Sequence, residues 1–255
     1  MDVKGKTVLL SGAGGGIGRA LARELKHEGA ELILTGRSTE ALAELSAELD
    51  ATMIAADLSR PDEVQRLVAR SGSVDVLIAN AAVHAGGRLG DVAVRDIDEA
   101  IAVNLRAPIV MAHGIVPLMV AQRHGHIVFI GSAGSRVTAA NSPVYNATKF
   151  GLRGFALALR QDLHRLGIGV SIVEPVFVRE AGMFVDSGVA VPRGMRTNSP
   201  HEVARAVVRT IKRNKAETIV APADMRLALA LGAMVPELSA RAGRLFGVNL
   251  ESPSR

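Results

Sequence analysis

A glycine-rich turn joins the first strand-like segment of this chain to its first amphipathic segment. Residues 10–18 read Leu-Ser-Gly-Ala-Gly-Gly-Gly-Ile-Gly, directly after an apolar run that begins at residue 7. Because glycine carries no side chain, such a turn can reverse tightly and lets the following helix pack close against the strand. A strand, a glycine turn and a helix in this order are typical of an α/β domain.

The rest of the chain alternates short apolar runs with amphipathic stretches. Apolar runs without polar alternation fit strands of a parallel sheet with helices on both faces. The expected strands are 7–11, 31–35, 52–55, 74–79, 126–131, 170–174 and 218–221, and the expected helices are 17–27, 40–49, 61–70, 96–123 (two helices divided near 107–108), 143–166 and 200–213. We expect Ser59 and Ser199 to cap the third and last of these helices. A doubly wound sheet or a (β/α)₈ barrel would fit, and the glycine turn favours the doubly wound sheet.

The composition excludes several classes of protein. The 255 residues are 48% hydrophobic, so the chain can bury a core, and they include no Cys, no Trp and one Tyr. A disulfide scaffold, a thiolate zinc site and an aromatic platform for single-stranded nucleic acid are therefore not expected. The seven histidines lack metal-ligand spacing, so we predict no metal. Without a signal-peptide pattern, the expected location is cytoplasmic.

The spacing of the glycines predicts a phosphate-binding turn. Gly12 is placed for the tight turn, Gly16 for the close approach of a pyrophosphate and Gly18 for packing of helix on strand. The N–H groups and dipole at the start of the following helix favour phosphate. The residues predicted to bind a dinucleotide here are Gly12, Gly14, Gly15, Gly16, Ile17 and Gly18, and a flexible turn without a ligand is the alternative.

The ends of the next strands indicate which dinucleotide is bound. NAD binders usually carry an acid about 20 residues beyond the glycines, but this chain has Arg37 and Ser38 there. A guanidinium can hold a 2′-phosphate, so NADP(H) is favoured and NAD(H) is possible; an exposed arginine is the alternative. Asp57, beside Leu58, is placed either to accept from the adenine amino group or to cap the next helix. The turn at Asn80 and Ala81 faces the crevice where ligands bind.

A tyrosine and a lysine four residues apart form a candidate catalytic pair. Tyr145 and Lys149 share a face of an expected helix, and a nearby cation lowers the pKa of a phenol. Ser132 follows the fifth strand and is placed to donate a hydrogen bond to a carbonyl oxygen. On its own such a pair is more often a surface feature, but joined to the glycine turn and Ser132 it favours acid–base catalysis.

In this order the motifs resemble those of the short-chain dehydrogenase/reductase family over residues 5–222. The resemblance rests on Gly12, Gly16, Gly18, Asp57, Asn80, Ala81, Asn104, Ser132, Tyr145 and Lys149. It implies a Rossmann-type doubly wound sheet of about seven parallel strands in a three-layer sandwich, and hydride transfer between a nicotinamide and a carbonyl/alcohol pair. Tyr145 would be the general acid/base, Lys149 would hold the nicotinamide ribose and tune Tyr145, and Ser132 would orient the carbonyl.

The resemblance also assigns roles outside these motifs. Asn104 would hold a water that relays protons from Lys149, with a kink in its helix as the alternative. Pro175 and Val178 would lie against the cofactor. The sequence departs from the family's usual Gly, Gly and Thr at Ala82, Val176 and Glu180, and it has Gly15 where NADP-preferring relatives often carry a basic residue.

The segment at residues 176–198 is too long for a simple connector. We predict that it forms a mobile lid over a pocket for an apolar ketone, aldehyde or alcohol, although its apolar side chains could instead pack on the domain. Residues 1–222 are expected to form the cofactor-binding and catalytic domain, with 223–255 as a basic amphipathic extension. A non-catalytic nucleotide-binding or scaffold protein is the second function considered, and the retained Ser132, Tyr145 and Lys149 argue against it.

The C-terminal part carries most of the net charge of +5, with nine Arg or Lys against five Asp or Glu over residues 201–255. For residues 225–246 a subunit interface is favoured over an amphipathic segment on a membrane, because Pro236 interrupts the stretch. The family resemblance implies a homodimer or homotetramer. No nucleic-acid-binding motif supports a nucleic-acid partner.

Overall fold

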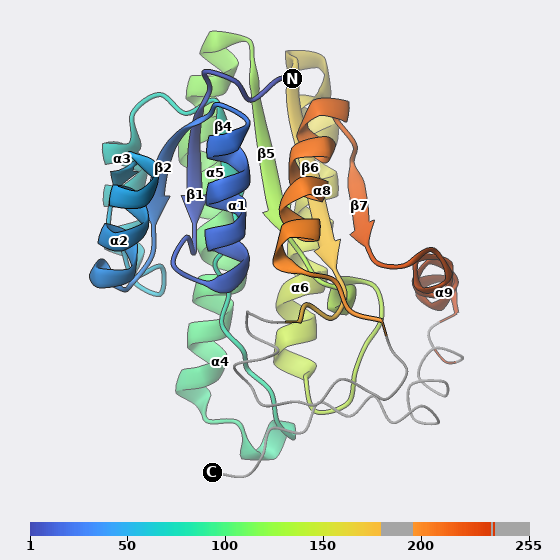
Figure 1. Cartoon of the computed structure of the whole chain (residues 1–255). Helices are drawn as coiled ribbons and strands as arrows, with labels where there is room; N and C mark the ends of the chain where they lie inside the picture. Colours follow the sequence, from blue (N-terminus) through green and yellow to red (C-terminus); the bar gives the residue numbers. More distant parts are fainter. Residues whose placement is uncertain (180–195, 236, 238–255) are drawn as a thin grey trace.

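Seven parallel strands form one sheet in the computed structural model, which describes residues 1–179, 196–235 and 237 (Figure 1). The strands are β1 (Thr7–Ser11), β2 (Glu31–Thr35), β3 (Thr52–Met53), β4 (Val76–Ala79), β5 (Gly125–Ile130), β6 (Ile168–Pro175) and β7 (Glu217–Val220). Their order is β3-β2-β1-β4-β5-β6-β7, so the direction of winding reverses between β1 and β4. In open α/β sheets, ligands bind outside the carboxyl ends of the strands at such a reversal.

Helices cover both faces of the sheet and confirm the three-layer sandwich. On one face lie α1 (Gly16–His27), α2 (Thr39–Leu49) and α8 (Pro200–Arg213), and on the other lie α3 (Pro61–Ser71), α5 (Ala107–Gln122) and α6 (Pro143–Leu163). In Figure 1, α1 and α8 stand in front of the sheet and α5 behind it. Side chains of β1 alternate between the two apolar layers, with Val8 and Leu10 in one and Leu9 in the other.

β3 and β6 differ in length from the expected strands, because different residues pair with a neighbouring strand. β3 has only two residues because it is an edge strand that pairs with β2 alone. β6 is longer than expected because β5 pairs with its first part and β7 with its last. Ser199 caps α8 in a capping box with Glu202, as predicted, whereas the prediction for Ser59 is wrong because Arg60 is the N-cap residue of α3.

One continuous helical segment replaces the two helices expected at residues 96–123. It comprises α4 (Val94–Ile101), a π-helical turn (Ala102–Arg106) and α5, so the division lies at the turn that contains Asn104. By length and composition alone the segment Val94–Gln122 could cross a membrane. However, Met111, Ile115 and Met119 of α5 are fully buried in the core, as in a covering helix of an α/β domain. The last described helix, α9 (Ala223–Met234), follows β7 and buries none of its residues.

Candidate active site

The glycine turn is compact because Gly12 and Gly18 lie directly against backbone atoms of other residues. Gly12 has φ of +66°, and a Cβ there would lie 2.8 Å from the Cα of Ala81. A Cβ on Gly18 would lie 2.0 Å from the carbonyl oxygen of Gly12. The N-cap residue of α1, Gly15, provides no side-chain cap, and the first turn of α1 carries no acid. The N–H groups of this helix end are therefore left for an anion, which fits a pyrophosphate.

A serine that the sequence analysis missed joins the glycine turn to β4. Ser11 at the end of β1 is fully buried, and its hydroxyl oxygen accepts from the N–H groups of Asn80 (3.0 Å) and Ala81 (3.2 Å). The amide nitrogen of Asn80 donates in turn to the carbonyl oxygens of Ser11 (3.0 Å) and Gly12 (3.1 Å). These four hydrogen bonds fix the two chain segments on either side of the sheet's reversal point. Both Asn80 and Ala81 lie where the sequence placed them.

The residues expected at the adenosine end already have partners in the protein. Arg37 forms an exposed ion pair of 3.0 Å with Glu99 of α4, and the Ser38 hydroxyl accepts from the N–H of Ala41 as the cap of α2. The carboxylate of Asp57 accepts from the N–H and hydroxyl of Ser59. Burial would raise the pKa of Asp57, but these hydrogen bonds and the nearby Arg37 and Arg60 charges lower it. The side chain of the neighbouring Leu58 is buried in the core.

Ser132, Tyr145 and Lys149 come together at the carboxyl edge of β5. The Ser132 side chain accepts from the N–H of Gly134 (3.1 Å), and a Cβ on Gly134 would lie 3.5 Å from the Oγ atom of Ser132 and 3.4 Å from the Cε1 atom of Tyr145. The ammonium of Lys149 is buried 5.7 Å from the centre of the Tyr145 ring, and it donates to the carbonyl oxygen of Ile130 at 3.0 Å. The serine, the phenol and the ammonium are thus neighbours, held by one helix and one strand end.

The electrostatics of this group differ from the expectation that Lys149 makes Tyr145 more acidic. Burial raises the pKa of Tyr145, and the hydrogen bond with Ser132 only opposes that effect. Burial also lowers the pKa of Lys149 to about 8, because a desolvated ammonium is disfavoured. In the protein alone, burial therefore sets the direction of both pKa shifts.

Asn104 holds the segment that follows β4. Its side-chain oxygen accepts from the N–H of Val83 (2.7 Å), and its amide nitrogen donates to the carbonyl of Val83 (2.9 Å) and lies 3.3 Å from the Thr148 hydroxyl. Thr148 itself donates to the carbonyl oxygen of Tyr145 at 2.8 Å. The side chain of Asn104 is thus committed to protein partners, within a π-helical turn of the kind often found at functional sites.

A buried network of ion pairs adjoins the turn that carries Ser132, and no local motif in the sequence predicted it. Glu174 of β6 is fully buried and pairs with Arg136 at 2.6 Å, while the hydroxyl of Ser135 also donates to it. Arg136 further pairs with Glu217 at 2.8 Å, and Arg153 of α6 reaches the same Glu217 at 2.7 Å. The network connects the turn after β5 with β6, β7 and α6.

The segment expected to form a lid is described only at its ends. Val178 and Asn198 form a parallel bridge, and the N–H of Asn198 donates to the carbonyl of Phe177 at 2.8 Å. The side chain of Asn198 also donates to Val220 at 2.7 Å, and the Val178 side chain is buried in the core. Pro175 ends β6 next to this bridge. Residues 180–195, with Glu180, lie outside the described part.

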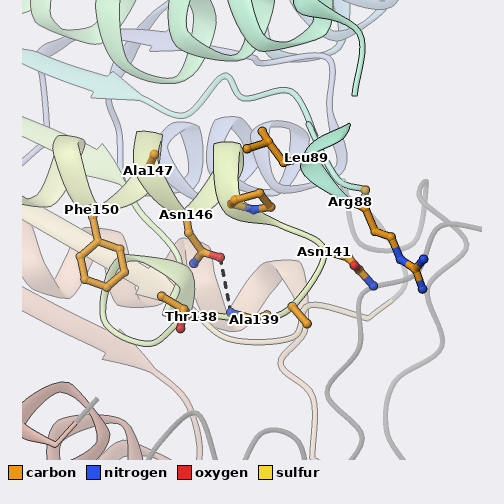
Figure 2. A pocket seen from close by; sticks show the side chains of 11 residues that line it. Arg88, Leu89, Thr138, Ala139, Asn141, Asn146, Ala147 and Phe150 are labelled. Carbon is orange, nitrogen blue, oxygen red and sulfur yellow. Dashed lines mark hydrogen bonds between the residues drawn. The ribbon is translucent and has the colours of Figure 1, made fainter. Parts of the chain in front are cut away.

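A cavity of about 640 Å³ lies at the start of α6, and none of Ser132, Tyr145 and Lys149 lines it (Figure 2). Its walls come from the loops before α4 and α6 and from α6 itself, and they are Gly87, Arg88, Leu89, Thr138, Ala139, Ala140, Asn141, Pro143, Asn146, Ala147 and Phe150. Asn146 holds the adjoining loop by donating to the carbonyl of Gly134 (2.8 Å) and accepting from the N–H of Ala139 (3.4 Å). Among the described residues there is no group of three or more metal-ligating side chains.

Comparisons with known proteins agree with this arrangement. A family model described as short chain dehydrogenase matches residues 6–190. HetN, a ketoacyl reductase of Nostoc sp., is 34% identical over 258 residues, which cover 96% of this chain and 90% of the relative. A short-chain dehydrogenase from Sphingobium yanoikuyae in complex with NADPH has a TM-score of 0.78 at 26% identity over 98% of both chains. The 3-ketoacyl-(acyl-carrier-protein) reductase of Brucella melitensis, complexed with NADH, has a TM-score of 0.78 at 25% identity over 86% of this chain and 97% of that chain.

Proposed function

The chain belongs to the short-chain dehydrogenase/reductase family and is an NAD(P)-dependent oxidoreductase; from this premise we propose that it reduces an apolar ketone or aldehyde with NADPH. The observation that carries the proposal is that the side chains of Ser132 and Tyr145 border the same residue, Gly134, beside the buried ammonium of Lys149. A structural role alone gives no reason to gather these three groups at the crevice.

The cofactor site is assigned from the features that fit it. The uncapped start of α1 takes the pyrophosphate, and Arg37 with Ser38 takes the 2′-phosphate. Pro175 and Val178 lie on the side of the nicotinamide, and a reduced nicotinamide supplies a hydride to the carbonyl carbon. NADPH is preferred over NADH because no acid stands at residues 34–38 to repel the phosphate.

Side chains of this protein stabilise the negative charge that develops on the carbonyl oxygen and supply its proton. The hydroxyl of Ser132 donates a hydrogen bond to that oxygen as it gains negative charge. The phenol of Tyr145 gives its proton to the same oxygen, which completes the alcohol. Lys149 keeps two N–H groups beyond the one bound to Ile130, and its charge stabilises the phenolate left behind. Asn104 keeps the surrounding segments in place through Val83 and Thr148.

The apolar nature of the substrate is supported by the relatives and by the sequence. HetN and the Brucella enzyme are both named as ketoacyl reductases, whose substrates carry a carbonyl on an acyl chain. Residues 176–198 of this chain include Phe177, Met183, Phe184, Val185, Val189, Val191 and Met195. We take 3-oxoacyl compounds as the first class of substrate to test.

The test is a screen of NADPH oxidation, followed by absorbance, over 3-oxo esters, 2-alkanones and aldehydes. Tyr145→Phe is expected to lower kcat by about a hundredfold or more, because general acid catalysis contributes that much. Ser132→Ala should lower kcat by a comparable factor. Equal rates in the wild type and Tyr145→Phe would exclude the mechanism. Binding of NADPH without turnover of any carbonyl would favour the non-catalytic alternative.

We also propose that the protein forms a homodimer or homotetramer through the outer faces of α5 and α6. Leu118 of α5 and Phe150 of α6 are both about two-fifths exposed, at 42% and 40%. Light scattering of wild type and Phe150→Asp tests this, and a monomeric wild type would exclude it. The segment at residues 225–246 is proposed to extend the same interface rather than to bind a membrane; most of its described part lies in α9, and residues 236 and 238–246 lie outside the described residues.

A further inference from the structure

A histidine next to Tyr145, His84, forms no hydrogen bond with any described residue. The ring centre of His84 lies 6.0 Å from that of Tyr145, with the two planes tilted by 50°. The histidine is partly exposed, and within the described part of the chain no residue forms a hydrogen bond with its ring. His84 is not among the buried side chains that lack a partner, so its ring nitrogens remain accessible to water or to a ligand.

The position of His84 is fixed by its surroundings. Val83, the residue before it, is held through both its N–H and its carbonyl by the side chain of Asn104. Gly86 lies directly against the imidazole, since a Cβ there would stand 2.1 Å from the Cε1 atom of His84. The two hydrogen bonds of Val83 and the contact with Gly86 therefore hold the imidazole ring beside Tyr145. A hydrogen bond to the ring itself is not needed to keep it there.

The chemical state of His84 suits recognition of a neutral group. Burial lowers the pKa of His84, so at neutral pH the imidazole is uncharged and offers one N–H donor and one acceptor nitrogen. A substrate that covers the crevice removes water from this ring. If the substrate offers no acceptor, the N–H group is left unsatisfied.

We propose that His84 is a substrate-contact residue that donates a hydrogen bond to a second oxygen of the substrate, next to the carbonyl that Tyr145 protonates. This inference rests on the proposed reductase function and names its substrate class more closely. The preferred substrates are carbonyl compounds with a further carbonyl oxygen a few bonds away, such as 3-oxo esters and thioesters. Simple ketones of equal length are poorer substrates, because they leave the imidazole without an acceptor.

A pair of substrates of matched length tests the proposal by steady-state kinetics. The ratio of kcat/KM for ethyl 3-oxobutanoate over 2-heptanone is measured in the wild type, His84→Phe and His84→Asn. His84→Phe keeps a ring but has no donor, and we expect it to lower the ratio by about tenfold to a hundredfold. His84→Asn keeps a donor and should restore most of the ratio. His27→Phe, an exposed position at the end of α1, is the matched control and should leave the ratio unchanged.

A purely structural role for His84 predicts a different result. The ring would then only support Tyr145, both substrates would suffer alike in His84→Phe, and the unchanged ratio would overturn the proposal.

A second measurement separates this proposal from the proposed function. The ring nitrogens of His84 are observed by NMR in Tyr145→Phe while ethyl 3-oxobutanoate or 2-heptanone is added with NADPH present. A shift of the His84 signals with the ester alone supports the contact, even if the wild type reduces neither compound. No difference between the ester and the ketone overturns it, even if the wild type reduces both.

Discussion

Arg136 and Glu174 form a buried ion pair, with the Nε atom of Arg136 2.6 Å from the Oε2 atom of Glu174 and side-chain exposures of 9% and 0%. Arg136 lies four residues after Ser132, and Glu174 directly precedes Pro175 at the end of β6. Burial raises the pKa of Glu174, and the hydrogen bond from Ser135 and the charge of Arg136 oppose it. The pair therefore connects the turn that carries Ser132 to the strand end beside the proposed nicotinamide site.

Removing one member of this pair should be strongly destabilising. Arg136→Met leaves the carboxylate of Glu174 buried with less compensation, and we expect a loss of about 3–5 kcal/mol in the free energy of unfolding. Arg153→Met is the matched control, since Arg153 is more exposed and lies 3.8 Å from Glu174, so the expected loss is about 1 kcal/mol. Urea denaturation of the three proteins measures the difference. Equal losses would show that Arg136 has no special role in compensating Glu174.

The elements whose signals are local could be predicted from the sequence. The glycine turn, the Tyr145–Lys149 pair and Ser132 each stand in a short motif next to a strand or helix end, so their placement follows from the fold. No local motif predicts the partners of Glu174, because Arg136 lies 38 residues away from it in the chain. Ser11 reads as part of a strand, although its hydroxyl binds N–H groups 69 and 70 residues further on.

The electrostatic prediction for Tyr145 failed for a related reason. Helical spacing correctly brought Lys149 near the phenol, but the sequence cannot show how deeply both groups are buried. Desolvation depends on all the elements packed around a site, and here it sets the direction of both pKa shifts. The hydrogen bonds of the Asn104 side chain could not be predicted from the local sequence either, because this side chain binds the backbone of a residue 21 positions earlier.

The glycines of the phosphate turn should differ in their tolerance to a methyl group. Gly18→Ala places a Cβ 2.0 Å from the Gly12 carbonyl oxygen, so backbone must move and the free energy of unfolding should fall by more than about 2 kcal/mol. Gly15→Ala places a Cβ 3.5 Å from the same oxygen, in ordinary contact and at φ of −78°, and should change stability by less than about 1 kcal/mol. Thermal unfolding compares them. A Gly18→Ala protein as stable as Gly15→Ala would contradict the close packing described here.

Arg37 should set the preference between the two nicotinamide cofactors. Arg37→Ala removes the proposed partner of the 2′-phosphate, and we expect the KM for NADPH to rise by about tenfold to a hundredfold relative to that for NADH. Glu99→Gln should lower the KM for NADPH, because it releases Arg37 from its 3.0 Å ion pair. Arg23→Ala, which breaks a comparable exposed pair with Glu48, is the control. If Arg37→Ala raises both KM values equally, the phosphate is held elsewhere.

Acid should destabilise the protein partly through His126. This side chain is 1% exposed and lies 2.8 Å from the hydroxyl of Ser171, and burial lowers its pKa to about 3. The pKa of His126 is near 6.5 in the unfolded chain and about 3 in the folded protein. At pH values between these two, the unfolded chain binds a proton that the folded protein does not. The contribution of His126 to stability is therefore complete above pH 6.5 and is lost as the pH falls. The difference in stability between the wild type and His126→Gln should therefore shrink by about 1.4 kcal/mol per pH unit from pH 6 to pH 4. Urea titrations at these pH values measure it, and parallel curves for the two proteins would refute the role of His126.

Lys149 should lower stability while serving catalysis. Its pKa falls from 10.5 in the unfolded chain to about 8 on burial, so at pH 7 the folded protein holds a charge that the interior disfavours by about 3 kcal/mol. Lys149→Met removes this charge, and we expect the protein without cofactor to gain about 2 kcal/mol at pH 7 and to lose activity.

The pH dependence distinguishes this effect from a simple gain in packing. From pH 8 toward pH 10 the folded wild type releases the Lys149 proton before the unfolded chain does, so wild-type stability rises with pH. Burial raises the pKa of Tyr145, and this lowers stability only above about pH 10, where the unfolded chain loses the phenol proton first. Over pH 7 to 9.5 the advantage of Lys149→Met should therefore shrink steadily. An advantage that stays constant over this range would mean that the buried ammonium is not the source of the instability.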